Sequence, residues 1–260
     1  MEVSNALADN GKSSANIVAV ASGKGGVGKT WLSVSLSQAL ANAGKATMLF
    51  DGDLGLANVD IQLDLAPERD LGGVIAGRYA LEAAKVRYDI GGFDVIAGRS
   101  GSGNLANLPN NRLGGLISDL VVLSNNYGYV ILDLGAGIER TVRQFANLAG
   151  TCLVVTNDEP TSLTDAYAFI KLTHQQFPGM DLRVVVNMAD SVSEGQRTYG
   201  TIRKACESFL KFTPPLAGII RRDSSVKESI RHQTPLLTRH PNSKAAEDIE
   251  ALARRLINGP

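Results

Sequence analysis

The chain has 260 residues, a length that fits one α/β domain. Lysine plus arginine and aspartate plus glutamate number 26 each, so net charge gives no overall attraction to nucleic acid or anionic lipid. The two cysteines form no CxxC pair, which argues against a disulfide framework, a thiolate metal site or an interfacial iron–sulfur cluster and favours a reducing cytoplasm.

The first segment, residues 1–16, is polar and lacks a signal-peptide apolar run, so we expect a flexible N-terminal lead. Residues 17–258 are expected to form a single domain. Buried strands are predicted at 17–21, 46–50, 93–97, 129–132, 152–156, 182–186 and 216–220, with a helix over 29–43, a surface loop over 98–111 and a terminal amphipathic helix after 241.

Strands that alternate with helices predict a doubly wound, mainly parallel α/β sheet with helices on both faces. Ligands bind such sheets beyond the carboxyl ends of the strands. The terminal helix has a narrow apolar face without Phe or Trp, which favours docking on the core over a membrane anchor. No apolar run reaches the ~18 residues that a membrane span needs.

A glycine-rich octapeptide with the spacing G-x-x-x-x-G-K-T lies between the first predicted strand and the first predicted helix, which is the context a phosphate-binding loop requires. Its glycines let backbone N–H groups point at phosphate oxygens, and the helix dipole adds to the attraction. The lysine is expected to reach the β- and γ-phosphates, and the threonine hydroxyl to ligate Mg²⁺. The alternative is a glycine-rich turn without a ligand. The residues are Gly23, Lys24, Gly25, Gly26, Val27, Gly28, Lys29 and Thr30.

Acidic residues follow two other predicted strands at the same edge of the sheet. Asp133 ends the strand at 129–132 and is placed to hold Mg²⁺ through a water, although a simple capping aspartate is the alternative. Gly137 follows, where a backbone N–H can sense a γ-phosphate. Asp51 and Asp53 follow the strand at 46–50, and two carboxylates so near phosphate need a metal ion and lysines to balance them.

The full octapeptide GKGGVGKT resembles the deviant Walker A motif of the MinD/ParA/nitrogenase-iron-protein class of ATPases. The resemblance implies that Lys24 reaches the nucleotide of a second copy in an ATP-dependent homodimer, and a solvated loop charge is the alternative. It further implies that Asp53 positions the attacking water, that Asp51 supports the metal, and that Asn187 reads the adenine edge. A simple turn residue is the alternative for Asn187.

Three longer parts of the chain resemble the FlhG/FleN (YlxH) flagellar number regulators. They are residues 53–60, residues 158–171 and the pattern Gly218, Asp223, Val226, Gln233-Thr234-Pro235, Pro241 and Ser243. The resemblance implies a slow regulatory ATP hydrolase that uses ATP, ADP and Mg²⁺. It implies as partners a flagellar transcription activator, an FlhF-like GTPase or switch-ring proteins, with recruitment from the cytoplasm to the cell pole or inner membrane through a partner. Residues 1–12 lack a DQAxxLR-like motif, which argues against stimulation of FlhF.

The alternative function is a ParA/MinD-like ATPase that positions cargo, division or partition machinery on the nucleoid or the membrane. Several basic residues near the C-terminus could form a DNA-binding face, but a solvated helix face is the simpler interpretation and nucleic acid is not favoured. They are Arg221, Arg222, Lys227, Arg231, His232, Arg239 and His240.

Overall fold

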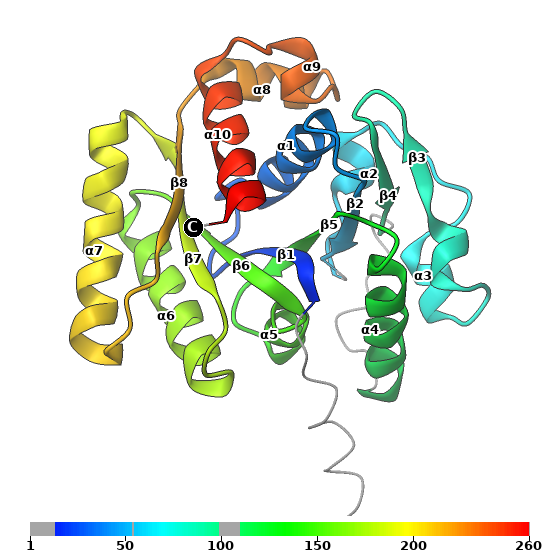
Figure 1. Cartoon of the computed structure of the whole chain (residues 1–260), viewed down its shortest axis with the longest axis horizontal. Helices are drawn as coiled ribbons and strands as arrows, with labels where there is room; N and C mark the ends of the chain where they lie inside the picture. Colours follow the sequence, from blue (N-terminus) through cyan, green and yellow to red (C-terminus); the bar gives the residue numbers. More distant parts are fainter. Residues whose placement is uncertain (1–13, 54, 99–109, 260) are drawn as a thin grey trace, which may run out of the picture.

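The computed structural model describes residues 14–53, 55–98 and 110–259. An eight-stranded sheet with the strand order β3-β4-β2-β5-β1-β6-β7-β8 forms its centre. Every strand pair is parallel except β3 with β4. The strand β1 lies in the middle, between β5 and β6, and helices pack on both sides of the sheet (Figure 1). The expectation of a doubly wound, mainly parallel sheet is therefore confirmed.

The strands are β1 (Ser14–Ser22), β2 (Thr47–Gly52), β3 (Val86–Tyr88), β4 (Phe93–Ile96), β5 (Tyr129–Ala136), β6 (Ala149–Thr156), β7 (Leu182–Ala189) and β8 (Leu216–Arg221). The longer helices are α1 (Lys29–Asn42), α4 (Asn110–Ser124), α5 (Arg140–Ala146), α6 (Pro160–Gln176), α7 (Val192–Leu210), α8 (Ser224–Arg231) and α10 (Lys244–Asn258). The short ones are α2 (Val59–Gln62), α3 (Leu71–Ile75), α9 (Leu236–Arg239) and the 3₁₀ turn η1 (Leu81–Ala84).

Two apolar cores flank the sheet, because successive side chains of each central strand point to opposite faces and both faces are covered. One core contains buried residues of α4, α5, α6 and α7. The other contains buried residues of α1, α2, α9 and α10. Cys152 on β6 is fully buried, as expected of a core residue, and both cysteines are free thiols. The sheet is thus a rigid platform whose carboxyl edge carries the loops discussed below.

The terminal helix α10 docks on the sheet, as predicted: Ala245, Ile249 and Leu252 are buried among the residues of α1 and β8. Among the residues described, no helix is both long and apolar enough to cross a membrane. The short antiparallel strand β3 was not predicted. It is only three residues long, at the edge of the sheet, and such a segment has too few positions to show a period.

Three local expectations differ from the structure. The strand β1 begins at Ser14 rather than at 17, so residues 14–16 of the expected N-terminal lead belong to the strand. Residues 1–13 lie outside the described part of the chain. The surface loop predicted over 98–111 is wrong at its end, because Asn110 and Asn111 already belong to α4; residues 99–109 lie outside the described part. The N-cap of α6 is Glu159, so neither Thr161 nor Ser162 caps this helix.

Candidate nucleotide site

The predicted phosphate loop spans the gap between the central strand β1 and α1, at the carboxyl edge of the sheet. It borders an open hollow of about 750 Å³ whose other walls come from the segment after β2, from Ala136 and from α8. The loop residues that line this hollow are Gly25, Gly26, Gly28, Lys29 and Thr30. The structure therefore brings most of the predicted loop to one cavity, together with Asp53.

Two of the loop glycines adopt a backbone conformation that side chains disfavour: φ is +80° at Gly26 and +91° at Gly28. Gly28 is the N-cap of α1, and a Cβ atom there would lie 2.5 Å from Nδ2 of Asn187. A Cβ atom on Gly23 would lie 2.1 Å from the carbonyl oxygen of Asp165. Glycine is therefore required at these positions by close packing as well as by the backbone.

Asn187 lies at the end of β7 and is 3% exposed. Its Nδ2 donates to the carbonyl oxygen of Val27 at 2.8 Å, and its Oδ1 accepts from the N–H of Met188 at 2.9 Å. The side-chain amide thus ties the phosphate loop to β7. This contact differs from the predicted role of reading an adenine edge, and spacing along the chain gave no signal for it, since the partners are 160 residues apart.

Two buried carboxylates lie side by side behind the loop. Asp51 on β2 is in register with Asp133 on β5, so their side chains project from the same face of the sheet. They are 0% and 1% exposed. Burial raises the pKa of Asp51, and the negative charge of Asp133 raises it further. Burial also raises the pKa of Asp133, against the opposing effect of hydrogen bonds from Thr30 and Ser33 and of the charge on Lys29.

Each carboxylate also has a local structural contact. Asp51 accepts hydrogen bonds from the N–H groups of Asp53 and Val59, both at 3.2 Å, and so shapes the segment between them. Asp133 accepts from Ser33 Oγ at 3.0 Å. Ser33 was not predicted as a site residue, although it lies three positions after Thr30 and thus on the same side of α1, a signal the sequence did contain.

Lys29 begins α1 and is only 9% exposed. Burial lowers its pKa, and the negative charges of Asp133 and Asp53 act in the opposite direction. Lys29 and the nearby carboxylates are charged groups with little contact with water. An anion on the glycine loop together with a divalent cation would balance these charges.

Asp53 and Gly137 lie on the two segments that face the loop. Oδ1 of Asp53 accepts from the N–H of Leu56 at 3.0 Å, and a Cβ atom on Gly135 would lie 3.2 Å from the same oxygen. Gly137 has φ of +114°, and its N–H donates to the carbonyl oxygen of Ser22 at 2.9 Å. The predicted phosphate-sensing N–H is therefore engaged with β1 in this structure.

Lys24 contacts the start of α6. Its Nζ donates to Oε2 of Glu159 at 2.5 Å and to Oγ1 of Thr161 at 2.7 Å. The hydrogen bond from Lys24 lowers the pKa of Glu159, and Nδ2 of Asn157 donates to the other carboxylate oxygen at 3.0 Å. Lys24 is 31% exposed and Glu159 55% exposed, so this pair lies at the rim of the site. This contact was not predicted, because the two residues are 135 positions apart.

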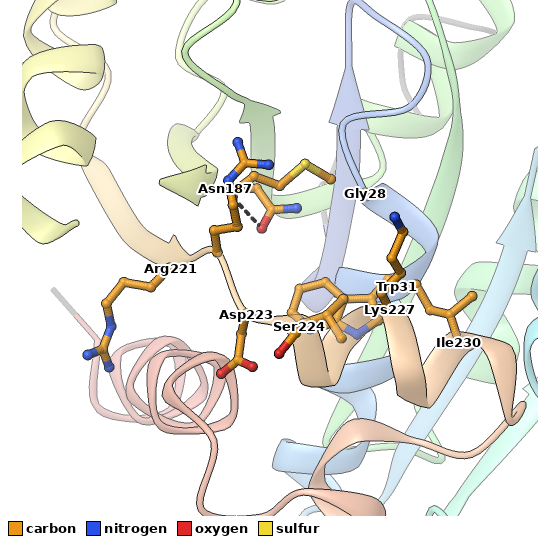
Figure 2. Close-up of a pocket in the computed structure, with 11 residues that line it drawn as sticks. Gly28, Trp31, Asn187, Arg221, Asp223, Ser224, Lys227 and Ile230 are labelled. Atoms are coloured by element: carbon orange, nitrogen blue, oxygen red, sulfur yellow. Dashed lines mark hydrogen bonds between the residues drawn. The ribbon is translucent and has the colours of Figure 1, made fainter. Parts of the chain in front are cut away.

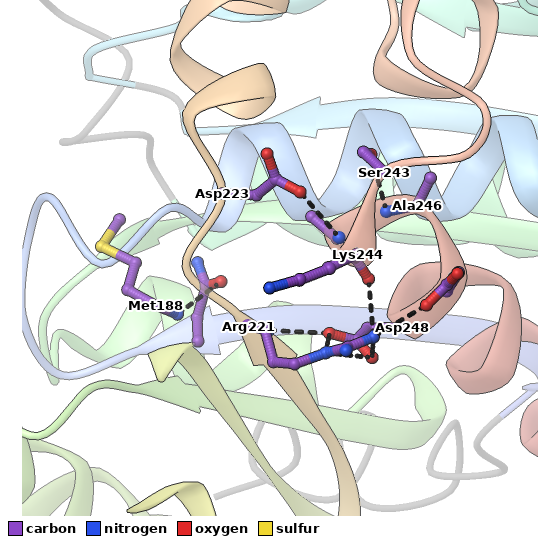
Figure 3. Close-up of polar contacts among 10 residues, drawn as sticks. Met188, Arg221, Asp223, Ser243, Lys244, Ala246 and Asp248 are labelled. Atoms are coloured by element: carbon purple, nitrogen blue, oxygen red, sulfur yellow. Dashed lines mark hydrogen bonds and ion pairs between the residues drawn. The ribbon is translucent and has the colours of Figure 1, made fainter. Parts of the chain in front are cut away.

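The basic residues near the C-terminus are largely paired with acids. Arg221 binds Asp248 with both Nε and Nη2 at 2.9 Å, and also Glu247 (Figure 3). The other pairs are Arg222 with Asp190 and both Arg239 and His240 with Glu228. Three of the four arginines in the predicted group, Arg221, Arg222 and Arg239, are therefore paired with acids, which disfavours a DNA-binding face made of this group.

Residues 18–236 match the model of the CobQ/CobB/MinD/ParA nucleotide binding domain. The chain belongs to the MinD/ParA family of nucleotide-binding ATPases. It is 38% identical to the antiactivator FleN of Pseudomonas aeruginosa, over 94% of this chain and 87% of FleN. It is 29% identical to the flagellum site-determining protein YlxH of Helicobacter pylori, over 95% of this chain and 83% of YlxH.

The fold agrees with this membership. The septum site-determining protein MinD of Pyrococcus horikoshii, solved with Mg-ADP, superposes with a TM-score of 0.78 at 23% identity, covering 94% of this chain and 96% of that one. This MinD/ParA-family chain is an ATP hydrolase, and the cofactors to compare with its site are the Mg²⁺ and ADP bound by the Pyrococcus protein. The residues of this chain fit these cofactors: the glycine loop leaves space for phosphate, and Thr30, Asp51 and Asp133 offer the oxygen ligands that Mg²⁺ prefers.

Proposed function

We propose that this FleN-like ATPase is a nucleotide-controlled switch that regulates flagellar number or placement by binding partner proteins. The observation that carries the proposal is the 38% identity to the antiactivator FleN over 94% of the chain, combined with a phosphate loop backed by two buried carboxylates. ATP favours a homodimer on this proposal, and hydrolysis returns the chain to the monomer. Nucleotide shifts the equilibrium because it binds the dimer more tightly than the monomer.

The phosphate loop performs the binding step. The N–H groups of residues 23–30 point toward the phosphate oxygens, and Lys29 neutralises the charge on the β- and γ-phosphates. Thr30, Asp51 and Asp133 would hold Mg²⁺, which would offset the negative charge of the phosphates. The buried lysine and the two carboxylates support these roles, because each is poorly solvated and gains most from charged partners.

Asp53 orients the water that attacks the γ-phosphate. Its carboxylate lies on the wall of the same hollow as Lys29 and Thr30 and is fixed by the N–H of Leu56 at 3.0 Å. Gly137 belongs to the facing segment and releases Ser22 when its N–H turns to the γ-phosphate. The chain thereby supplies positioning and charge, which are what catalysis of phosphoryl transfer mainly requires.

Lys24 acts on the nucleotide of a second copy. Apolar residues around the mouth of the hollow support a dimer that closes over this site: Leu56 is 73%, Ile61 54% and Ile230 41% exposed, and all three line the hollow. A second copy would remove these side chains from water.

The output on this proposal is protein binding. The candidate partners are a flagellar transcription activator, an FlhF-like GTPase or switch-ring proteins, which would recruit the chain from the cytoplasm to the cell pole or the inner membrane. A positioning function on nucleoid or membrane is less well supported, because most of the C-terminal arginines are paired with acids and α10 is docked in the core.

The test is size-exclusion chromatography with light scattering on the Asp53→Ala variant, with Mg-ATP and with Mg-ADP. We expect a dimer with ATP and a monomer with ADP, because the variant binds ATP but does not complete hydrolysis. The double variant Lys24→Ala/Asp53→Ala should stay monomeric with ATP. A dimer in both variants, or in neither, would contradict the cross-dimer role. A deletion strain with normal flagellar number and position would refute the flagellar output.

A further inference from the structure

A second hollow, of about 430 Å³, lies directly beside the phosphate loop (Figure 2). It is bounded by α1, the end of β7, the end of β8 and the start of α8. Gly28, Trp31, Met188 and Ile230 line both this hollow and the larger one that holds the loop. The two are therefore adjoining parts of one site. A molecule whose phosphates lie on the loop can extend its remaining part into the second hollow.

Trp31 stands at the junction of the two hollows. It is the only tryptophan in the chain, lies on the first turn of α1 directly after Thr30, and is 5% exposed. Figure 2 shows it opposite the residues that α8 contributes to the same hollow, among them Ile230. Val226 and Met188 complete an apolar lining around the ring. Most of Trp31 is covered by the protein, and the part of it that lines the hollow, together with the flexible apolar side chains beside it, suits a planar heteroaromatic ring.

The polar residues that line the second hollow are mostly engaged elsewhere. Arg221 is held by Asp248, and Asp223 caps α8 and accepts from Ser225 N–H at 2.9 Å and Ala245 N–H at 3.4 Å (Figure 3). Arg222 is paired with Asp190, and the amide of Asn187 holds Val27. These contacts fix the side chains around the hollow, and Asn187 and Arg222 keep further donors that could bind a ligand without exchange of these contacts. Packing against Trp31 requires no such exchange either.

We propose that Trp31 forms the aromatic wall against which the base of the bound nucleotide packs, and that it makes base-containing ligands bind more tightly than bare polyphosphate. The inference rests on the proposed function, because it needs phosphates on the adjoining loop. Stacking of a base on an aromatic side chain contributes substantially to affinity and depends little on the identity of the base. Trp31 therefore strengthens the binding of ATP and ADP equally and has no direct contact with the reacting phosphate.

The test is titration calorimetry of the parent, Trp31→Ala, Trp31→Phe and Lys29→Ala, each with Mg-ADP and with Mg-tripolyphosphate. We expect Trp31→Ala to weaken Mg-ADP binding about tenfold and to leave Mg-tripolyphosphate binding within about twofold of the parent. Trp31→Phe keeps an aromatic face and should stay within about threefold for both ligands. In the parent, Mg-ADP should change the emission of Trp31, and Mg-tripolyphosphate should change it much less.

Three results would overturn the inference: unchanged Mg-ADP binding in Trp31→Ala, equal weakening of both ligands in Trp31→Ala, or weakening of Mg-ADP in Trp31→Phe as large as in Trp31→Ala. Equal weakening would show that the residue only maintains the loop. Lys29→Ala separates this from a failure of the proposed function. If Lys29→Ala binds tripolyphosphate as tightly as the parent does, the phosphate site itself is wrongly assigned.

Discussion

Asn187 joins the phosphate loop to β7, and its side chain is almost fully buried. Asn187→Ala leaves the carbonyl oxygen of Val27 and the N–H of Met188 without these partners, so we expect a loss of about 1–3 kcal/mol in unfolding free energy. Because the loop itself shifts, binding of both Mg-ADP and Mg-tripolyphosphate should weaken. Urea unfolding and titration calorimetry measure the two effects.

The exposed Asn125, just beyond α4, provides the control, and Asn125→Ala should change neither quantity. If Asn187→Ala weakens only Mg-ADP and leaves tripolyphosphate binding unchanged, the residue reads the base, as the resemblance to the MinD/ParA class implied. Tripolyphosphate lacks a base, so its binding separates the two roles. The observed contact with Val27 predicts weaker tripolyphosphate binding in Asn187→Ala, whereas a contact with adenine alone predicts no change.

At the scale of elements, α10 holds the end of β8 in place. The segment that follows β8 contributes lining residues to the second hollow. Asp248 is 14% exposed and accepts from both the guanidinium and the backbone N–H of Arg221. We expect Asp248→Ala to lower the unfolding free energy by about 2 kcal/mol, because the guanidinium and the backbone N–H of Arg221 lose the less exposed of the two carboxylates that bind the side chain. Glu247 is 63% exposed, so Glu247→Ala should cost less than about 0.5 kcal/mol.

Urea unfolding followed by circular dichroism compares the two variants with the parent. Equal losses for Asp248→Ala and Glu247→Ala would show that α10 is held by its apolar face alone. The sequence predicted that apolar face, because its apolar residues recur at helical spacing. They include Ala245, Ile249 and Leu252. The partners of Arg221 were not predicted, because they depend on how α10 crosses β8.

The same distinction explains how much of the fold and site the sequence predicted. Seven strands of the sheet were recognisable because buried parallel strands read as short apolar runs between helices. The phosphate loop was recognisable because its spacing is itself the geometric requirement. The edge strand β3 was not recognisable, because three residues are too few to show a period. The contacts of Asn187 with Val27 and of Lys24 with Glu159 were not, because each joins segments distant in sequence.

At the scale of the whole molecule, the contact between Lys24 and Glu159 opposes the proposed dimer. Lys24 cannot reach a second copy's nucleotide while its Nζ is bound to Glu159 and Thr161 of its own chain. Both charged side chains are partly exposed, so the pair contributes little to folding, but it has to be exchanged each time a dimer closes. Glu159→Gln keeps the shape and removes the charge.

In the Asp53→Ala background, we expect Glu159→Gln to lower the ATP concentration for half-maximal dimerisation by about two- to fivefold, the effect typical of losing one exposed ion pair. Light scattering across an ATP titration measures it. The matched control is Glu207→Gln, since Glu207 pairs with Arg203 on α7 and is similarly exposed. Glu207→Gln should leave the midpoint unchanged. If Glu159→Gln raises the midpoint instead, Glu159 stabilises Lys24 in the closed dimer, and its contact in the monomer prepares the interface rather than restraining it.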